Sequence, residues 1–231
     1  MSLEQRYRAL EAQIARCCRE NGRDPGEVRI LAVSKTVGQA EVKAAIAAGI
    51  GDFAENRIEA LVEKQRGLEG PTWHFIGNIQ SRRIPEIVAH ADLIHSLYRV
   101  QHVEEIEKAA AAASKVQSLL IEVNTSGEES KGGLAPAEVP QMLRLCSEAA
   151  HIRVCGFMTM AAIGEAKRAR ACFESLAGLA REMRCAFPSP MLELSELSMG
   201  MSEDWREAIA AGATMIRLGR IIFDEGFDPE S

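Results

Sequence analysis

The sequence lacks the features that mark membrane, secreted and nucleic-acid-binding proteins. No stretch approaches the roughly 18 uninterrupted apolar residues of a transmembrane helix. The first residues, Met1 to Glu4, lead directly into a charged, helix-like pattern rather than a signal peptide. A net charge of −6 argues against general affinity for nucleic acid or anionic membranes. We therefore expect a cytoplasmic protein that binds neither nucleic acid nor membrane.

Cysteine and histidine are present but do not form the spacings of disulfide frameworks or metal sites. The six cysteines have no C-x-x-C spacing, and the five histidines include no H-x-x-x-H pair. We expect free thiols in a reducing compartment and no bound metal. The cysteines are Cys17, Cys18, Cys146, Cys155, Cys172 and Cys185.

No stretch rich in glycine, serine or proline divides the 231 residues. The hydrophobic fraction of 47% and the charged fraction of 26% are ordinary for a globular protein. The length suits one eight-stranded barrel, which typically needs about 200–250 residues. We expect a single domain over residues 1–231.

Eight short apolar or β-branched runs alternate with alanine-rich amphipathic stretches. Strands that are apolar on both faces and alternate with helices indicate a parallel sheet covered by helices. Eight such units predict an α/β fold, a single (β/α)₈ TIM-type barrel with an extra N-terminal helix from Leu3 to Glu20. A doubly wound open sheet is the alternative. The predicted strands are 30–34, 52–54, 73–76, 93–95, 118–123, 152–157, 192–197 and 214–218; the predicted helices include 39–48, 84–90, 101–113, 136–150 and 165–186.

Lys35 directly follows the first predicted strand, at the end of the barrel where active sites lie. A desolvated lysine has a depressed pKa, which leaves some free amine at neutral pH. A free amine can condense with an aldehyde to form a Schiff base. The alternative is a lysine whose charged end simply extends into solvent.

Two glycine-containing segments follow the seventh and eighth strands, where this architecture usually binds phosphate. In the first, Ser198-Met199-Gly200-Met201-Ser202, Ser202 is placed to cap a helix whose backbone N–H groups would face an anion. An ordinary helix cap beside a flexible methionine loop is the alternative. In the second, Arg217-Leu218-Gly219-Arg220, Gly219 allows close approach of a phosphate. Together with Lys35, these segments suggest a phosphorylated aldehyde as ligand.

Seven segments, taken in order, resemble the pyridoxal phosphate homeostasis protein family, which is related to the N-terminal barrel domain of alanine racemase. Each motif is weak alone, but together they span nearly the whole chain. They are LAVSKT (31–36), FAEN (53–56), WHFIG (73–77), VN (123–124) with SKxG (130–133), GFMTM (156–160), LSMGMSxD (197–204), and MIRLG (215–219) with IF (222–223).

The resemblance implies pyridoxal 5′-phosphate as cofactor, held on Lys35 as a Schiff base. It implies that Met158 packs against the pyridine ring and that Arg217 faces the pyridine nitrogen. A cation there keeps the nitrogen unprotonated, which makes the cofactor a poorer electron sink. The other implied cofactor-binding residues are Asn56, His74 and Ser198, together with Ser202 and the backbone of Gly219 and Arg220, which resemble a phosphate cradle.

The chain departs from the family pattern at two places. Gln80-Ser81-Arg82-Arg83 stands where the family commonly has a lysine shortly after the glutamine, and Asp224 stands where it usually has glycine. We interpret Arg82 and Arg83 as a solvated helix start. An acid near the phosphate loops could weaken anion binding.

The resemblance implies a protein that carries or buffers pyridoxal phosphate in vitamin B6 and amino-acid homeostasis, more a regulator than an enzyme. Its partners would be the cofactor and pyridoxal-phosphate-dependent apoenzymes, and we expect a monomer. A racemase of this class takes a second base, a tyrosine, from an additional β-domain. Here the chain ends at Ser231, and its tyrosines, Tyr7 and Tyr98, fall in the N-terminal helix and at the start of a mid-chain helix. We expect both to pack against the barrel.

Three other functions stay open. The protein could be a single-domain amino-acid racemase, or a Schiff-base aldolase acting on a sugar phosphate. It could also be an interaction protein with a vestigial cofactor site.

Overall fold

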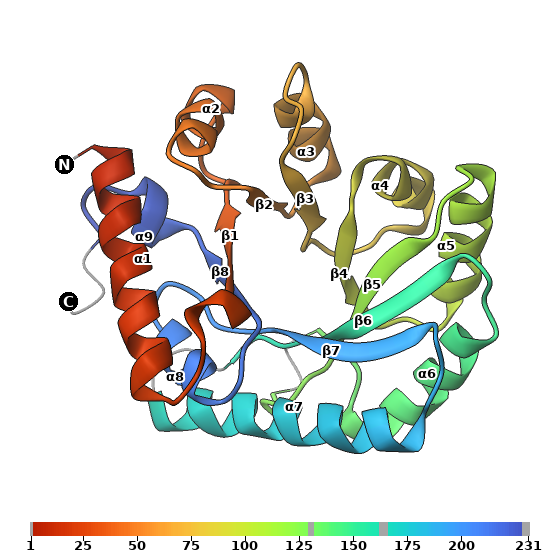
Figure 1. The fold of residues 1–231 in the computed structure, drawn as a ribbon. Helices are drawn as coiled ribbons and strands as arrows, with labels where there is room; N and C mark the ends of the chain where they lie inside the picture. The colour runs from red at the N-terminus through yellow and green to blue at the C-terminus, as the bar shows by residue number, and fades with distance from the viewer. Residues whose placement is uncertain (1, 129–131, 162–165, 228–231) are drawn as a thin grey trace.

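The computed structural model describes residues 2–128, 132–161 and 166–227. Its eight strands are all parallel, each pairs with the next, and β8 pairs with β1 to close a barrel (Figure 1). The (β/α)₈ prediction is therefore confirmed, and the open sheet is wrong. The strand ends differ from the predicted ones by at most two residues. The strands are β1 (Arg29–Val33), β2 (Asp52–Glu55), β3 (Thr72–Phe75), β4 (Leu93–Leu97), β5 (Gln117–Glu122), β6 (Ile152–Met158), β7 (Leu192–Ser198) and β8 (Met215–Leu218).

Helices surround the strands as a ring (Figure 1). The helix predicted over 136–150 is shorter than expected, because a 3-10 turn, Pro136–Glu138, precedes α6. Pro140 has no N–H to donate back to Pro136, so the regular helix begins only at Val139. The start predicted for α7, residue 165, lies outside the described residues. The helices are α1 (Leu3–Glu20), α2 (Gln39–Ala47), α3 (Ile58–Gln65), α4 (Ile84–His90), α5 (Gln101–Ala112), α6 (Val139–Ser147), α7 (Ala166–Ala186), α8 (Trp205–Ala210) and α9 (Arg220–Phe223).

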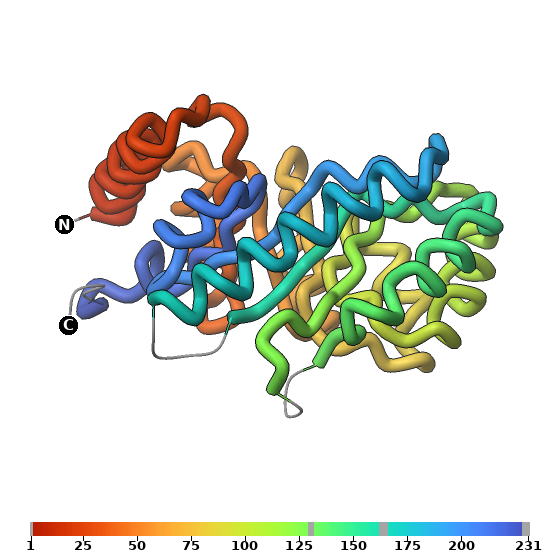
Figure 2. Tube along the Cα trace, turned by 90° about the horizontal axis from the view of Figure 1, so that it is seen from below, coloured from red at the N-terminus to blue at the C-terminus, as the bar shows by residue number. Residues whose placement is uncertain are grey.

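The extra N-terminal helix is confirmed. Ser2 Oγ accepts a hydrogen bond from the N–H of Gln5, whose side chain accepts one from the N–H of Ser2, and this reciprocal pair starts α1. The helix lies beside the C-terminal segment (Figure 2), where Arg6 Nη1 contacts Glu225 at 2.7 Å. Its apolar stripe is buried by this packing: Tyr7, Leu10, Ile14, Cys17 and Cys18.

The core has two parts because successive strand residues point to opposite faces of the sheet. The larger part lies between strands and helices, and the smaller part fills the barrel interior. Buried polar side chains accompany this interior cluster, among them His74, His95, Ser198 and Arg217. The interior is therefore mixed in polarity, which is unusual for a barrel packed only for stability. The interior apolar cluster is Leu31, Val33, Ala54, Leu93, Leu120, Met158 and Met215.

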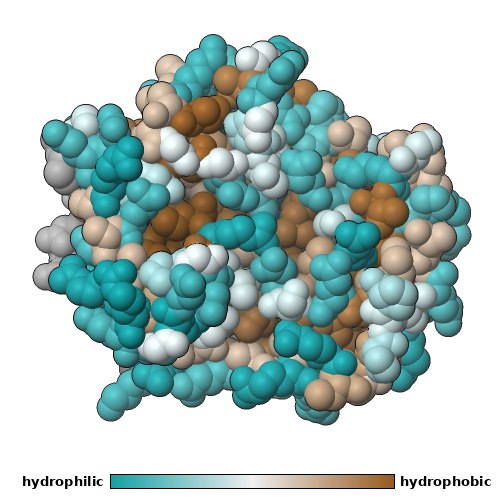
Figure 3. All heavy atoms as spheres, viewed as in Figure 1, coloured by the Kyte–Doolittle hydropathy of each residue, from teal (hydrophilic) through white to brown (hydrophobic). Residues whose placement is uncertain are grey.

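Two further features of the structure bear on the sequence predictions, the state of the cysteines and the length of the apolar helices. All six cysteines are free, as predicted. No helix formed by the described residues is long and apolar enough to cross a membrane. Hydrophilic residues cover much of the face in Figure 3, and the hydrophobic ones show mostly in its recesses.

Candidate functional site

Lys35 follows β1 at the carboxyl end of the barrel, as predicted, but its side chain is exposed. Of the two alternatives for this lysine, the structure shows the one in which the charged end extends into solvent. The residue before it is fixed instead. The N–H of Ser34 donates to the carbonyl of Ala54 at 3.1 Å, and the buried Ser34 hydroxyl donates to Glu55 Oε1 at 2.7 Å. Lys35 thus extends from a rigid strand end.

A buried ion pair behind this strand end was not predicted. Lys64, on α3, is 6% exposed and contacts the buried Glu55 carboxylate, and its Nζ also donates to the Ser34 carbonyl at 2.6 Å. Glu55 Oε2 has no hydrogen-bond partner among the described residues. The sequence carried one signal of this pair: Lys64 continues the buried stripe of Ile58 and Leu61 at a spacing of three residues.

Arg217 is a buried cation at the centre of the site, with an exposed fraction of 4%. Its Nη1 donates to Ser198 Oγ at 2.8 Å, and its Nη2 donates to the carbonyl of Thr159 at 2.9 Å. Burial lowers the pKa of Arg217 to about 10, against the opposing charges of Asp204 and Glu122. The guanidinium therefore remains charged at neutral pH. Burial raises the pKa of both carboxyls, and Arg217 partly offsets that rise.

The segments after β7 and β8 lie next to each other and to the end of β1. The N–H of Arg217 donates to the carbonyl of Gly200 at 2.9 Å, and a Cβ on Gly219 would lie 3.2 Å from the carbonyl oxygen of Val33. Gly200 has a φ of +91°, and a Cβ there would lie 2.6 Å from the Ala208 side chain, so glycine is required. These contacts bring the predicted phosphate segments beside the strand that carries Lys35.

The residues predicted to form a phosphate cradle lie together at the start of α9, whereas α8, the helix that Ser202 was expected to cap, has Asp204 as its N-cap. Ser202 is buried, and its Oγ accepts from the N–H of Ile221 at 3.4 Å. The next two amides, of Ile222 and Phe223, donate to the carbonyl of Gly219. The N–H of Arg220 is the first of the helix, where no intrahelical acceptor exists. A phosphate could accept hydrogen bonds from the Ser202 hydroxyl and from such an amide.

The two charged side chains near the cradle point elsewhere. Arg220 forms an ion pair with Glu203, and its guanidinium lies 4.9 Å from the centre of the Phe227 ring. Asp224 is exposed at the opposite end of α9, and its carboxylate accepts from the N–H of Gly226 at 2.9 Å. The departure at Asp224 therefore serves a local turn rather than the cradle.

Asn56 and Met158 lie on opposite sides of the barrel mouth. Met158 is the last residue of β6, buried in the interior cluster and paired in register with Ser198. Asn56 is exposed after β2 and lines a cavity of about 90 Å³ with Asn78 and Gln80. Both occupy strand ends, as predicted.

The arginines after β3 differ from each other. Arg82 is exposed, as expected of a solvated helix start. Arg83 is half-buried, lines the same small cavity and pairs with Glu59 and Glu86, so it links α3 and α4. Ser130 and Lys131, which belong to the SKxG motif, lie outside the described residues.

His74 lies inside the barrel below the strand ends. Its Nε2 is 3.0 Å from Asp52 Oδ1, and its Nδ1 is 2.9 Å from Nε2 of His95. Both ring nitrogens are engaged, and its contact with the cofactor stays a prediction. His95 was not predicted to matter, because its strand reads as an ordinary apolar one.

The tyrosines occupy different environments. Tyr7 is buried under α1, as expected. Tyr98 directly follows β4, three residues before α5 begins, and packs against the hydrophobic core as expected. It is half-buried at the carboxyl end of the barrel.

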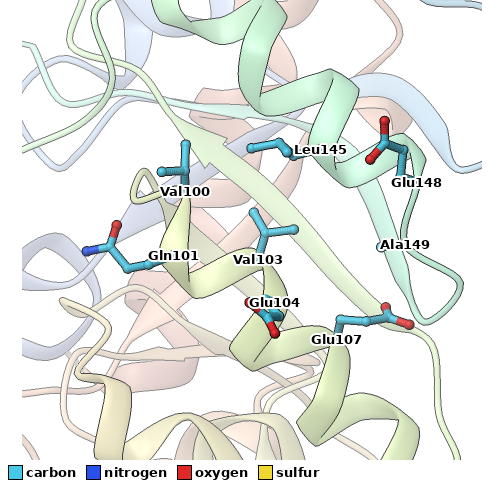
Figure 4. A pocket seen from close by; sticks show the side chains of 8 residues that line it. All are labelled: Val100, Gln101, Val103, Glu104, Glu107, Leu145, Glu148 and Ala149. Atoms are coloured by element: carbon cyan, nitrogen blue, oxygen red, sulfur yellow. The ribbon is translucent and has the colours of Figure 1, made fainter.

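A larger groove of about 420 Å³ lies between α5 and α6, on the outside of the barrel (Figure 4). Its lining includes the apolar Val103 and Leu145 and the acidic Glu104, Glu107 and Glu148. Three carboxylates disfavour a phosphate, and none of the predicted cofactor-binding residues lines it. The strand-end site is therefore the better candidate.

Comparison with known proteins assigns the family. The family model described as "Alanine racemase, N-terminal domain" matches residues 7–225. A protein of Aquifex aeolicus named pyridoxal phosphate homeostasis protein is 34% identical over 96% of this chain and 97% of its own length. One of the same name from Pseudomonas aeruginosa is 36% identical over 93% of this chain and 91% of its own. This chain belongs to the pyridoxal phosphate homeostasis protein family.

A solved relative of this family extends the comparison to three dimensions. The structure of PipY from Synechococcus elongatus with PLP bound has a TM-score of 0.85 and 32% identity, over 96% of this chain and 100% of that one. The residues here suit such a group by their own chemistry. They offer an amine at the barrel mouth, a buried guanidinium, and a hydroxyl with a helix-start amide for the phosphate.

Proposed function

We propose that this protein binds pyridoxal 5′-phosphate at the carboxyl ends of β1, β7 and β8, and that it carries or buffers the cofactor through a reversible Schiff base on Lys35. The observation that best supports this proposal is that three groups lie near one another at these strand ends: the exposed amine of Lys35, the buried Arg217, and Ser202 at the start of α9. The bound form of a 32%-identical relative supports the same ligand.

The residues of the site have separate tasks in this proposal. The Lys35 amine condenses with the aldehyde, which releases one water, and hydrolysis returns both partners. Ser202 and the amides of Gly219 and Arg220 hold the phosphate, and Met158 packs against the ring. Asn56, His74 and Ser198 are the other proposed cofactor-binding residues. Arg217 faces the ring nitrogen, and its charge opposes protonation there.

A carrier suits this arrangement better than a catalyst. The cofactor supplies an aldehyde and an electron-accepting ring, but a nearby cation weakens the ring as an electron sink. The exposure of Lys35 suits loading and release of the cofactor. We further propose a single-domain, monomeric, cytoplasmic protein that does not bind nucleic acid and that passes its cofactor to pyridoxal-phosphate-dependent apoenzymes.

Titration with the cofactor tests the proposal. We expect a visible absorption band to form with the wild-type chain, and we expect Lys35→Ala to abolish it. Lys43→Ala, which alters another exposed lysine, serves as the matched control and should keep the band. Loaded protein should also activate a pyridoxal-phosphate-dependent apoenzyme across a dialysis membrane. A colourless wild-type protein, or an unchanged band in Lys35→Ala, would refute the proposal.

A further inference from the structure

A chain of hydrogen bonds runs through the barrel from its amino end to its carboxyl end. Asp52 is the first residue of β2, and its side chain is 24% exposed. From there the contacts run from Asp52 Oδ1 to His74 Nε2 (3.0 Å), from His74 Nδ1 to His95 Nε2 (2.9 Å), and from His95 Nδ1 to Ser198 Oγ (2.9 Å). Arg217 closes the chain by donating to the same Ser198 oxygen at 2.8 Å.

The direction of every bond follows from the two ends. Arg217 can only donate, and the Asp52 carboxylate can only accept. If both histidines are neutral, His74 must donate from Nε2 to Asp52 and accept at Nδ1. His95 then donates from Nε2 and accepts at Nδ1 from the Ser198 hydroxyl. Each donor meets one acceptor, so the chain has a single polarity and fixes both tautomers.

Adding one proton at His74 reverses part of the chain. Both nitrogens of His74 would then donate, so His95 would have to accept at Nε2 and carry its proton on Nδ1. His95 would donate to Ser198 Oγ, which already accepts from Arg217, and the serine hydroxyl would lose its acceptor. A proton gained beside Asp52 therefore alters the contact that holds Arg217.

The surroundings of His95 keep its ring uncharged whether His74 carries one proton or two. His95 is fully buried, and its ring lies edge-to-face with that of His74. Burial, followed by the charges of His74, Arg217 and Arg29, holds the pKa of His95 well below its ordinary value. At the amino end Arg29 is paired with Glu196 at 2.5 Å, and at the carboxyl end Glu122 and Asp204 face Arg217. His74 is thus the histidine of the pair that contacts a carboxylate, that of Asp52.

We propose that Asp52, His74, His95 and Ser198 are positioning residues for Arg217, and that they couple the proton state of the barrel's amino end to the cofactor site. The inference rests on the proposed function only in that Arg217 faces the cofactor. The chain itself belongs to the protein without ligand, so it can be tested there.

Nitrogen NMR of the histidine rings in the cofactor-free protein is the first test, with signals assigned by single His→Gln variants. At pH 8 we expect His74 and His95 to be neutral and protonated on Nε2. In the form in which both His74 nitrogens carry a proton, His95 should hold its own proton on Nδ1 rather than Nε2 while staying neutral. A His95 tautomer that is unchanged in that form, or a cationic His95, would overturn the proposal.

Cofactor binding gives the second test. Glutamine carries one acceptor and one donor, so His95→Gln should keep the chain and bind pyridoxal phosphate within about threefold of wild type. His95→Leu removes the acceptor of the Ser198 hydroxyl and the partner of His74 Nδ1, and should bind about tenfold more weakly. His151→Gln, a change at a half-exposed histidine outside the hydrogen-bond chain, is the matched control. Equal affinities for the leucine and glutamine variants would contradict the inference.

Asp52→Asn keeps the test decisive if His95→Leu does not fold. In loaded wild-type protein the visible band should change with pH, and Asp52→Asn should alter that change because it removes the carboxylate that His74 contacts. If the pH dependence of the band is the same in Asp52→Asn as in wild type, the proposed coupling through the hydrogen-bond chain is wrong. A wild-type protein that does not bind the cofactor at all would refute the proposed function. The NMR result would still show whether the hydrogen-bond chain couples His74 to His95.

Discussion

Arg217 Nη1 donates a hydrogen bond of 2.8 Å to Oγ of Ser198, across the neighbouring strands β8 and β7. This contact joins a fully buried cation to the last residue of a strand, at the end of the barrel where the chain's unusual polar residues gather. It lies between the interior histidines on one side and the phosphate segments on the other. Much of the behaviour expected of this protein follows from how that cation is held.

Arg217→Gln should destabilise the fold by about 3–5 kcal/mol, because removing one member of a buried charged group leaves the others uncompensated. The carboxyls left behind are those of Glu122 and Asp204. Chemical denaturation measures the change in the free energy of unfolding. Arg153→Gln removes a half-exposed arginine and should have little effect.

The same variant should respond to pH in a defined direction. Burial raises the pKa values of Glu122 and Asp204 above their ordinary ones in the folded wild-type chain, and loss of Arg217 should raise them further. The folded state then binds protons that the unfolded state has released, so stability falls as pH rises from about 4 through the raised pKa values. Unfolding curves should show Arg217→Gln recovering relative to wild type on acidification. A constant difference at all pH values would contradict this explanation.

Ser202→Ala should weaken binding of pyridoxal phosphate about tenfold, the effect of losing one hydrogen bond to a charged group. Binding of pyridoxal, which has no phosphate, should be nearly unchanged. Equilibrium titration with both compounds separates the two cases, and Ser175→Ala on the exposed face of α7 is the control. A parallel loss for both ligands would show that Ser202 acts on the fold rather than on the phosphate.

Lys64→Met should lower the free energy of unfolding by about 3–5 kcal/mol, because it strands the Glu55 carboxylate in the interior. The double variant Glu55→Gln/Lys64→Met should recover most of that loss, since no buried charge remains. Lys108→Met breaks an exposed ion pair with Glu104 and should leave stability essentially unchanged. If the double variant is as unstable as Lys64→Met, the packing of α3 matters more than the charge.

Gly200→Ala should lower the free energy of unfolding by about 2–4 kcal/mol. The added Cβ would be strained by the left-handed backbone at this position and would also clash with the Ala208 side chain. Gly212 offers the matched comparison. It also has a positive φ, but a Cβ there would meet nothing within 4 Å, so Gly212→Ala should cost about 1 kcal/mol. Denaturation of both variants checks the difference, and equal losses would mean that the contact with Ala208 is unimportant.

The fold could be predicted from sequence because each strand reads as a short apolar run, and several polar residues of interest lie at or shortly after the end of one. Ser202 follows β7 by four residues and Arg217 is the next-to-last residue of β8, and the structure places both segments beside the end of β1. Local pattern carries this information because parallel strands end on the same side of a barrel.

What the sequence did not reveal depends on contacts between distant elements. Lys64 meets Glu55 only once α3 packs on β2, and nothing in the helix alone names its partner. His95 contacts His74 and Ser198 from three different strands, which requires the barrel register. The exposure of Lys35 also depends on how far the neighbouring loops extend over it, and local sequence does not specify that.

Reductive trapping followed by peptide mapping locates the lysine that holds the cofactor. The protein is loaded with pyridoxal phosphate, reduced with borohydride and digested, and the labelled lysine is located by mass spectrometry. We expect one dominant label, on Lys35, and none on the buried Lys64. A dominant label on any other lysine, or no label on a protein that retains the cofactor, would contradict this expectation.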